Sequence, residues 1–300
     1  MKKKTYLFAL MAMALTLGSC SDNENGIGGE TSKYITVSTS IGNMTRVATD
    51  EKGGQTFEEG DEISVYAWTG DATVAPETRE RVVNNAINKL TNGSWVSTPQ
   101  MLWKNNRDKH YFIGVYPISA ISDLTAGEYT FDETKQVESD LLVAVNKDGL
   151  SYNVDEQQPV PLTFTHVMAK LVVNLTYKNQ WGGIPTVEKV VVGNAAKEAT
   201  INYLTKVVTP STTAKEDFSL PEITENSKYV SVIIPQEEVK QLTIVIGGKN
   251  FVYDNGTPFK LESGKITTVN LEVGRDEIKL GDVKITDWEN GSTFSGEALN

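Results

Sequence analysis

From residue 34 onward, the chain is dominated by short runs in which apolar and polar residues alternate. Successive side chains of a strand point to opposite faces, so a period of two is typical of half-buried strands. The first run begins at Tyr34, and its alternation puts four residues on one face: Ile35, Val37, Thr39 and Ile41. A sheet with one apolar face is stable only when another layer covers that face. The alternation therefore predicts an all-β protein with packed sheets.

Further segments have the length and the Val, Ile and Thr content of strands. They cover residues 63–68, 111–116, 141–145, 170–177, 187–192, 229–234, 242–246, 251–253, 266–273 and 283–288. Residues 79–90 fit either a helix or a hairpin arm, and their β-branched residues favour a strand. Turn dipeptides separate the runs at Asn92-Gly93, Gly182-Gly183, Gly247-Gly248 and Asn255-Gly256. Many short strands at this spacing predict β-sandwiches.

A boundary between two domains is predicted near Gln157-Gln158-Pro159, where a polar stretch gives way to a long apolar segment. We therefore expect an N-terminal sandwich over residues 33–160 and a C-terminal sandwich over residues 161–300. Residues 160–177 are expected to cross between the two domains as two strands with a bend around His166.

The N-terminus has the pattern of a secretory leader. Lysines at positions 2–4 precede an apolar stretch over residues 6–17, and small residues lead to Cys20. The apolar stretch is too short to span a bilayer core of about 30 Å. A cysteine at this position resembles a bacterial lipobox, in which the thiol is acylated, although a free thiol behind an ordinary leader is the alternative. We predict a signal peptide over residues 1–19 and a flexible tether over residues 20–32, anchored in the outer membrane through Cys20.

Composition limits the classes of partner. Cys20 is the only cysteine of the chain, so no internal disulfide is expected. Loss of residues 1–19 removes three lysines, which changes the formal net charge from −11 to −14. Nucleic-acid binding proteins need clustered Lys and Arg, so we expect no nucleic-acid partner.

Catalytic and metal-binding patterns are absent from the sequence. The two histidines, His110 and His166, are far apart and have no second ligand type at metal spacing. No nucleophile elbow or phosphate-binding glycine loop is present. We therefore expect no enzyme activity and no cofactor, and we interpret His166 as a structural histidine.

Two clusters allow a functional alternative. Glu58, Glu59 and Asp61 provide either a carboxylate pair or, more simply, a solvated turn before a strand. The tryptophans form either a sugar-stacking platform or ordinary packing: Trp68, Trp95, Trp103, Trp181 and Trp288. We favour the turn and the packing, and we keep carbohydrate binding as an alternative function.

Arg46 follows the first predicted strand and is the first arginine of the chain. The polar, glycine-containing residues 47–55 come next and predict a loop. An arginine in an exposed loop is a processing site for an arginine-specific or trypsin-like protease, because proteases prefer flexible segments. The alternative is a single exposed arginine without a role. Cleavage between Arg46 and Val47 would remove the lipid, the tether and the first strand together.

Loss of a strand that closes a sandwich would expose an unpaired edge and an apolar groove. Such an edge binds a strand from another chain. A subunit that exchanged its own strand for a neighbour's would polymerise head to tail.

Several motifs along nearly the whole chain resemble those of the Bacteroidetes fimbrillins, the subunits of a lipoprotein-derived pilus. Each motif alone is weak, but their order and spacing are fairly specific. They are the lipobox ending at Cys20, TRVA at residues 45–48, EGDEISVY at 59–66, YPISA at 116–120, DLLVA at 140–144, LTFTHVMAKL at 162–171, GKITTVNL at 264–271 and ITDW at 285–288.

The resemblance implies two tandem transthyretin-like β-sandwich domains and export as a surface lipoprotein. It implies acylation of Cys20 and cleavage after Arg46, after which the first strand is displaced and a strand from another fimbrial subunit replaces it. The candidate donor segment covers residues 283–300, with Val283, Ile285 and Trp288 as its apolar residues. Its alternating part is short, so an accessory or tip subunit that accepts a strand is one possibility. An anchor that is never cleaved, or a carbohydrate-binding surface lipoprotein, is the alternative.

Overall fold

The computed structural model describes residues 33–42, 56–153, 158–254 and 256–288. Strands β1 to β19 form four sheets, which confirms the all-β prediction. These described residues belong to one compact unit. Two short 3-10 helices interrupt the strands, η1 (Thr78–Glu80) and η2 (Asn179–Trp181).

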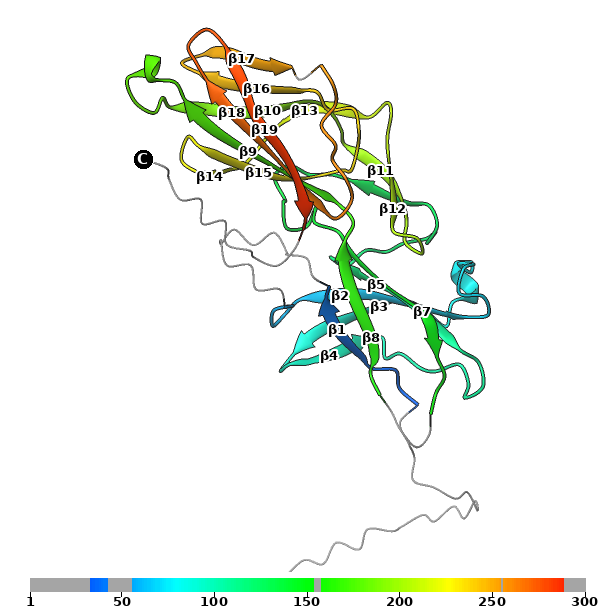
Figure 1. The fold of residues 1–300 in the computed structure, drawn as a ribbon. Coiled ribbons are helices and arrows are strands. Elements are labelled where there is room, and N and C mark those ends of the chain that lie inside the picture. Colours follow the sequence, from blue (N-terminus) through cyan, green and yellow to red (C-terminus); the bar gives the residue numbers. More distant parts are fainter. Residues whose placement is uncertain (1–32, 43–55, 154–157, 255, 289–300) are drawn as a thin grey trace, which may run out of the picture. The chain divides into compact units, whose positions relative to one another are not determined.

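A seven-stranded sheet contains the first strand of the chain, as Figure 1 shows. Its spatial order is β1-β8-β7-β5-β2-β3-β4, so β1 and β4 form the two edges. The strands are β1 (Val37–Ile41), β2 (Glu62–Thr69), β3 (Val83–Thr91), β4 (Ser94–Thr98), β5 (His110–Tyr116), β7 (Leu142–Leu150) and β8 (Val160–His166).

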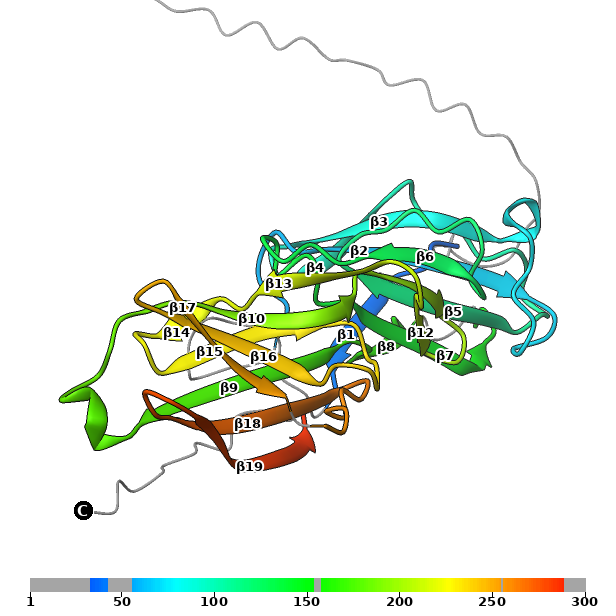
Figure 2. The same cartoon turned by 90° about the horizontal axis from the view of Figure 1, so that it is seen from above.

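A five-stranded sheet has the order β14-β15-β9-β18-β19. Figure 2 shows β9, β18 and β19 side by side, with β18 parallel to β9 and antiparallel to β19. The strands are β9 (Ala169–Tyr177), β14 (Glu222–Thr224), β15 (Lys228–Ile233), β18 (Lys265–Val273) and β19 (Ile278–Asp287).

Two smaller sheets complete the fold, with orders β13-β10-β16-β17 and β12-β11-β6. Their strands are β6 (Gly127–Thr130), β10 (Val187–Ala196), β11 (Glu198–Asn202), β12 (Val207–Pro210), β13 (Lys215–Ser219), β16 (Gln241–Ile246) and β17 (Lys249–Asp254).

Two of the turn dipeptides make tight hairpins, as the sequence indicates. Asn92 and Gly93 join β3 to β4 with φ values of 51° and 72°, and Gly247 and Gly248 join β16 to β17 with φ values of 58° and 70°. Positive φ at both central residues is the geometry of a type I′ turn, which matches the twist of the flanking strands. Residues 79–90 contain most of β3, which confirms the strand interpretation.

The crossing near residue 160 consists of two strands, as expected. β8 pairs with β1 and β7 in the seven-stranded sheet, and β9 begins at Ala169 in the five-stranded sheet. However, β6 precedes the expected domain boundary and pairs with β11, which follows it. The boundary and the two transthyretin-like domains stay predictions.

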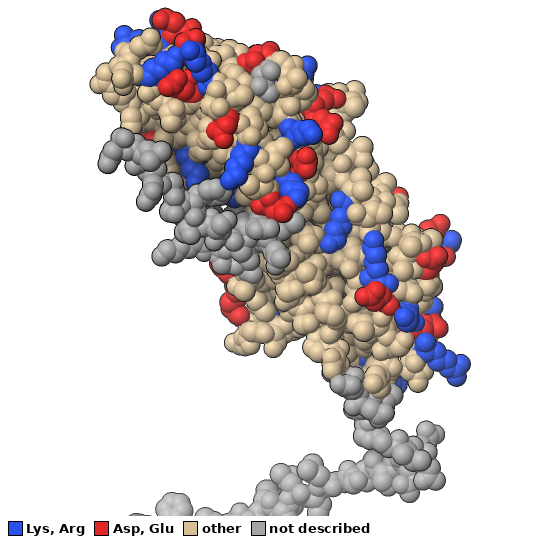
Figure 3. Space-filling model, in the orientation of Figure 1, with Lys and Arg blue, Asp and Glu red and all other residues tan. Residues whose placement is uncertain are grey.

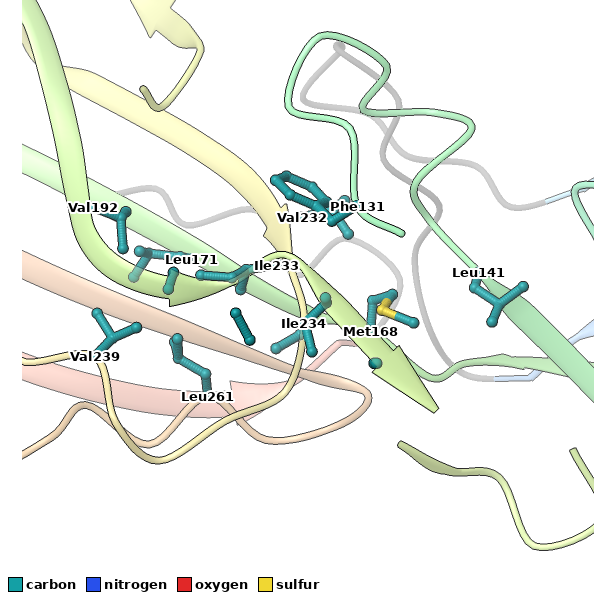
Figure 4. Packing of buried hydrophobic residues seen from close by; sticks show 14 of the residues in the cluster. Phe131, Leu141, Met168, Leu171, Val192, Val232, Ile233, Ile234, Val239 and Leu261 are labelled. Carbon is teal, nitrogen blue, oxygen red and sulfur yellow. The ribbon is translucent and has the colours of Figure 1, made fainter. Parts of the chain in front are cut away.

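Two clusters of buried apolar side chains stabilise the fold. The smaller cluster lies on the seven-stranded sheet and includes Ile35, Val37 and Phe164. The larger cluster includes residues of both β5 and β9. Figure 4 shows part of the larger cluster, where side chains from different elements point toward one another: Leu171 of β9, Val192 of β10, Val232 and Ile233 of β15, and Ile234, Val239 and Leu261 of the connecting segments.

Gly114 of β5 makes room for the aromatic ring of Phe164. A Cβ atom on Gly114 would lie 2.6 Å from Cζ of Phe164 and 3.1 Å from Cδ1 of Leu162. Both neighbours belong to β8 and are buried. The close approach of β5 to the β8 side chains therefore requires a residue without a side chain at position 114.

We predict that Gly114→Ala lowers the free energy of unfolding by about 1–3 kcal/mol, because overpacking forces side chains or backbone to move. Urea denaturation followed by tryptophan fluorescence measures this loss. The double variant Gly114→Ala/Phe164→Leu should recover part of it. Gly42→Ala is the control, because its nearest neighbour would be 3.4 Å away. Equal loss in the control would show that the ring of Phe164 is not the cause.

Candidate functional site

The candidate site is the edge strand β1 and the surface that it covers. β1 pairs with β8 in the parallel direction, with Val37 opposite Val160 and Ile41 opposite Phe164. Figure 1 shows the two strands side by side. The pairing is extended at both ends, where Val160 N–H donates to Thr36 O at 2.8 Å and Gly42 N–H donates to Phe164 O at 2.8 Å.

The residues just before β1 contact the segment that follows β4, the strand at the opposite edge of the same sheet. Ile35 N–H donates to Met101 O at 2.9 Å, and Trp103 N–H donates to Lys33 O at 3.2 Å. Trp95 of β4 also donates from Nε1 to Thr39 Oγ1 at 3.0 Å. Residues 33–42 therefore connect β8, near one edge of the sheet, to β4 and the loop after it.

Burial along β1 alternates as the sequence predicts. The side chains of Ile35 and Val37 are 2% and 6% exposed, whereas Tyr34 is 44% exposed. Thr39 and Ile41 are half-buried. A fully buried aliphatic side chain contributes roughly 1.5–3 kcal/mol, so Ile35 and Val37 together contribute about 3–6 kcal/mol. The inward face thus has two strong anchors, fewer than the four that the alternation suggests.

Aromatic side chains form the surface next to β1. The ring of Phe57 makes edge-to-face contacts with Trp95, Tyr116 and Phe164, at centroid distances of 5.3, 5.5 and 5.1 Å. These rings lie in or against the smaller buried cluster, to which Ile35 and Val37 belong. Removal of β1 would expose apolar surface that a strand of similar pattern can cover.

The remaining sites predicted near the N-terminus, Cys20, Arg46 and Val47, lie outside the described residues. The last described residue after β1 is Gly42, which precedes Arg46 by four positions. Among the described residues, no helix is long and apolar enough to span a membrane.

The candidate donor residues differ in burial. β19 is an edge strand, and its Val283 and Ile285 are each 38% exposed. They pair with Val269 and Thr267 of β18, which are fully buried. Trp288 follows the strand and is fully buried. Val283 and Ile285 therefore form an exposed apolar strip, whereas Trp288 is buried.

Trp288 stacks on His166, with centroids 4.0 Å apart and an interplanar angle of 11°. His166 Nδ1 lies 2.7 Å from Asp140 Oδ1, and both side chains are buried, which favours the structural interpretation of His166. In the described part of the chain, His166 Nε2 and Trp288 Nε1 have no hydrogen-bond partner. Lys170 Nζ lies 5.3 Å from the Trp288 ring centroid, and burial lowers the pKa of this amine while the charge of Asp140 opposes the shift.

The other side chains considered for catalysis or metal binding, His110 and the acidic residues at positions 58–61, make hydrogen bonds within the fold. His110 Nε2 accepts a hydrogen bond from Lys104 N–H at 3.0 Å, and burial lowers the pKa of His110, which favours the neutral imidazole that such an acceptor requires. Glu59 accepts from Asn92 N–H at 2.6 Å, and Asp61 accepts from Glu58 N–H at 2.7 Å. No group of three potential metal ligands occurs among the described residues.

The tryptophans pack rather than form a platform. Trp68 and Trp288 are buried, and Trp95, Trp103 and Trp181 are half-buried. Trp181 contacts Phe251 with a centroid distance of 5.7 Å. These contacts favour the packing interpretation over sugar stacking. On the face shown in Figure 3, basic and acidic side chains are interspersed and form no basic patch.

Comparison with known proteins gives a family match. Residues 45–288 match the family model described as Fimbrillin-like. A curated relative from Bacteroides uniformis, named "Putative fimbrium subunit Fim1C", is 25% identical over an alignment covering 99% of this chain and 100% of the relative.

Two solved structures share the fold. A "putative cell adhesion protein" from Bacteroides uniformis has a TM-score of 0.64 and 17% identity, covering 85% of this chain and 98% of that one. The tip fimbrial protein Mfa3 from Porphyromonas gingivalis has a TM-score of 0.51 and 11% identity, covering 82% of this chain and 98% of that one.

We predict that Val37→Asp detaches β1 while the rest of the chain stays folded. An unpaired carboxylate at this buried position is unfavourable by several kcal/mol. Hydrogen exchange of the β8 amides, measured by mass spectrometry, should accelerate at least about tenfold, which corresponds to about 1.4 kcal/mol. Ser38→Asp is the control, because Ser38 is exposed on the opposite face. Unchanged exchange in Val37→Asp would contradict a β1 held by its inward face.

Proposed function

This chain belongs to the fimbrillin-like family, and from that premise we propose that it is a fimbrial subunit assembled by protease-triggered β-strand exchange. The observation that carries the proposal is the position of residues 33–42. They form one edge of the seven-stranded sheet and cover an apolar surface. They also contact the segment that follows β4, the strand at the opposite edge. Because β1 is an edge strand, this segment can leave without breaking the pairing between the other strands of the sheet.

The order of residues along the chain supports two steps: delivery of the acylated chain to the outer membrane, and then its release from the lipid by cleavage. Cys20 precedes β1 and Arg46 follows it, so cleavage after Arg46 separates lipid, tether and β1 from everything else. The acylated chain is proposed to reach the outer membrane surface with β1 in place. An arginine-specific or trypsin-like protease then removes residues 1–46, and the fimbrium replaces the membrane as the protein's location.

The exposed site is proposed to accept a strand from a neighbouring fimbrial subunit. After loss of β1, β8 becomes an edge strand next to an apolar surface, which are the two features that strand addition requires. Main-chain hydrogen bonds would set the direction of the incoming strand, and the places of Ile35 and Val37 would select its apolar residues. Repetition of this step produces a head-to-tail polymer.

The donor is proposed to come from residues 283–300 of the neighbour. Val283 and Ile285 alternate as Val37 and Thr39 do, and both are exposed on the edge strand β19. Their release requires β19 to separate from β18, with which it pairs over most of its length. A subunit that keeps β19 in place would accept a strand without donating one, as an accessory or tip subunit does.

A surface lipoprotein that is never cleaved is the second candidate function, favoured by the complete ladder between β1 and β8. In that case β1 is a permanent strand and Cys20 a permanent anchor. Carbohydrate binding receives less support, since all five tryptophans are buried or half-buried.

We predict that Arg46→Ala leaves the protein folded and lipid-anchored but unable to join fibres, because β1 then stays attached. Fibres sheared from cells and quantified by immunoblotting measure the effect. Lys52→Ala is the matched control, since it removes another basic residue from the same segment and should leave fibre formation unchanged. Fibres that still form from Arg46→Ala in a protease-dependent way would place the cut elsewhere.

The mature N-terminus separates the two candidate functions. We predict that protein isolated from fibres begins at Val47. Edman degradation or mass spectrometry of the N-terminal peptide provides the measurement. An N-terminus at an acylated Cys20 in all surface material would instead support the permanent anchor.

A further inference from the structure

A groove with a volume of about 540 Å³ lies beside β12, outside the site of β1. Its lining combines apolar residues, such as Val208 and Leu261, with hydroxyl groups and with the side chains of lysines and glutamates. Small-molecule sites have volumes in this range and also combine an apolar lining with a few polar groups. The groove therefore has room for a molecule of the size of a simple sugar.

Lys206 is held at the wall of this groove by the hairpin between β11 and β12. Asn202 Oδ1 accepts hydrogen bonds from the backbone N–H groups of Leu204 and Thr205, both at 3.1 Å. Lys206 follows with a φ of 61°, in the left-handed region that residues other than glycine rarely adopt. Its Nζ donates a hydrogen bond of 2.9 Å to Thr165 Oγ1 of β8. The turn and this hydrogen bond together fix the position of the amine.

The surroundings of Lys206 favour the neutral form of its amine. The side chain is half-buried, and none of the described carboxylates forms an ion pair with it. Burial lowers the pKa of Lys206, and the nearby charge of Lys147 on β7 lowers it further. A neutral amine has a free electron pair and is a nucleophile, whereas an ammonium group has none.

Two other lysines each lack one of these features. Lys215 lines the same groove, but it forms an ion pair with Glu238, in which the charged ammonium has no free electron pair. Burial lowers the pKa of Lys170 as well, but its Nζ lies 5.3 Å from the centroid of the Trp288 ring, away from the groove. Of these three lysines, Lys206 alone combines an open groove with an amine that forms no ion pair.

We propose that Lys206 is a covalent binding site for small neutral aldehydes, including the open-chain forms of reducing sugars. The electron pair of Nζ attacks the carbonyl carbon, so that a C–N bond forms while the π electrons of the carbonyl move to its oxygen. The oxygen gains a proton and the nitrogen loses one, which gives a carbinolamine. Loss of water then gives an imine. Amine and aldehyde thus become imine and water, and the step needs no oxidant or reductant. The inference goes beyond the proposed strand exchange and does not depend on it.

The charges of the groove select against anionic carbonyl compounds. Glu237 and Glu262 line the groove, and neither forms an ion pair with a described residue. Their carboxylates repel an anionic ligand, but they accept hydrogen bonds from the hydroxyl groups of a neutral one. Ser211, Thr212 and Ser263 provide further polar groups. A neutral aldehyde that carries hydroxyl groups therefore suits this lining better than an acidic one.

Reductive labelling of the full chain tests the proposal. The chain is incubated with glyceraldehyde and sodium cyanoborohydride at neutral pH, so that each imine is reduced to a stable secondary amine. Mass spectrometry of peptides then gives the labelling rate of each lysine. We expect Lys206 to react at least about tenfold faster than Lys170, Lys215 and the exposed Lys189, which corresponds to about 1.4 kcal/mol in the activation barrier.

The pH profile gives a second readout. Because its pKa is lowered, Lys206 keeps more neutral amine than Lys189 as the pH falls, so its labelling should continue to a lower pH. Lys206→Arg keeps the positive charge and removes the nucleophile, so the fast phase of labelling should disappear. Lys215→Arg is the matched control on the same groove and should leave that phase unchanged.

The anionic aldehyde glyoxylate tests the choice of a neutral ligand. Glyoxylate should label Lys206 more slowly than glyceraldehyde does, and the double variant Glu237→Gln/Glu262→Gln should reduce the difference.

Equal labelling of Lys206 and Lys189 in the unmodified sequence would overturn the inference, as would a fast phase that remains in Lys206→Arg. Glyoxylate that reacts as fast as glyceraldehyde would overturn the assignment of a neutral aldehyde. None of these results bears on strand exchange, because the labelled chain is not assembled into fibres.

Discussion

The hydrogen-bonded pairing between β1 and β8 is the interaction that completes the seven-stranded sheet and on which the proposed assembly depends. β8 is the second strand of the seven-stranded sheet, and without β1 it would become the edge. Its inward residues, Leu162 and Phe164, are fully buried and pack above Gly114 of β5. β1 therefore does more than add one strand, because it covers residues that the interior of the sheet is built around.

The end of β8 is also the place where separate parts of the chain meet. His166 lies there between Asp140 and Trp288, and the chain then turns into β9 of the next sheet. Thr165, one residue earlier, contacts Lys206 near β12. Contacts of this kind place the ends of β1, β8 and β19 near one another, although they are far apart in sequence. The end of β1 therefore pairs with Phe164, two residues before the histidine that stacks on Trp288.

Local patterns in the sequence predict the strands well, but not their partners. The alternation around Val37 reflects the period of a single strand, so β1 and its inward face are predictable. Its parallel pairing with β8 and its contacts with Met101 and Trp103 depend on tertiary packing between distant residues. Short strands such as β6 and β12 lack a long apolar run and give no clear signal. Trp288 is out of phase with Val283 and Ile285, so periodicity alone does not predict its burial.

The covalent link between β1 and the body of the protein has a further consequence. As part of the same chain, β1 is an intramolecular ligand, and covalent linkage can raise the effective concentration of a ligand at its site to the millimolar range. No free strand at ordinary concentration competes with such a ligand of equal fit. If the link were cut as proposed, a dissociated β1 would be diluted like any other peptide, and an equally fitting strand from a neighbouring subunit would gain the advantage. In the proposed assembly, covalent attachment would therefore determine when exchange begins, without any change in the binding surface.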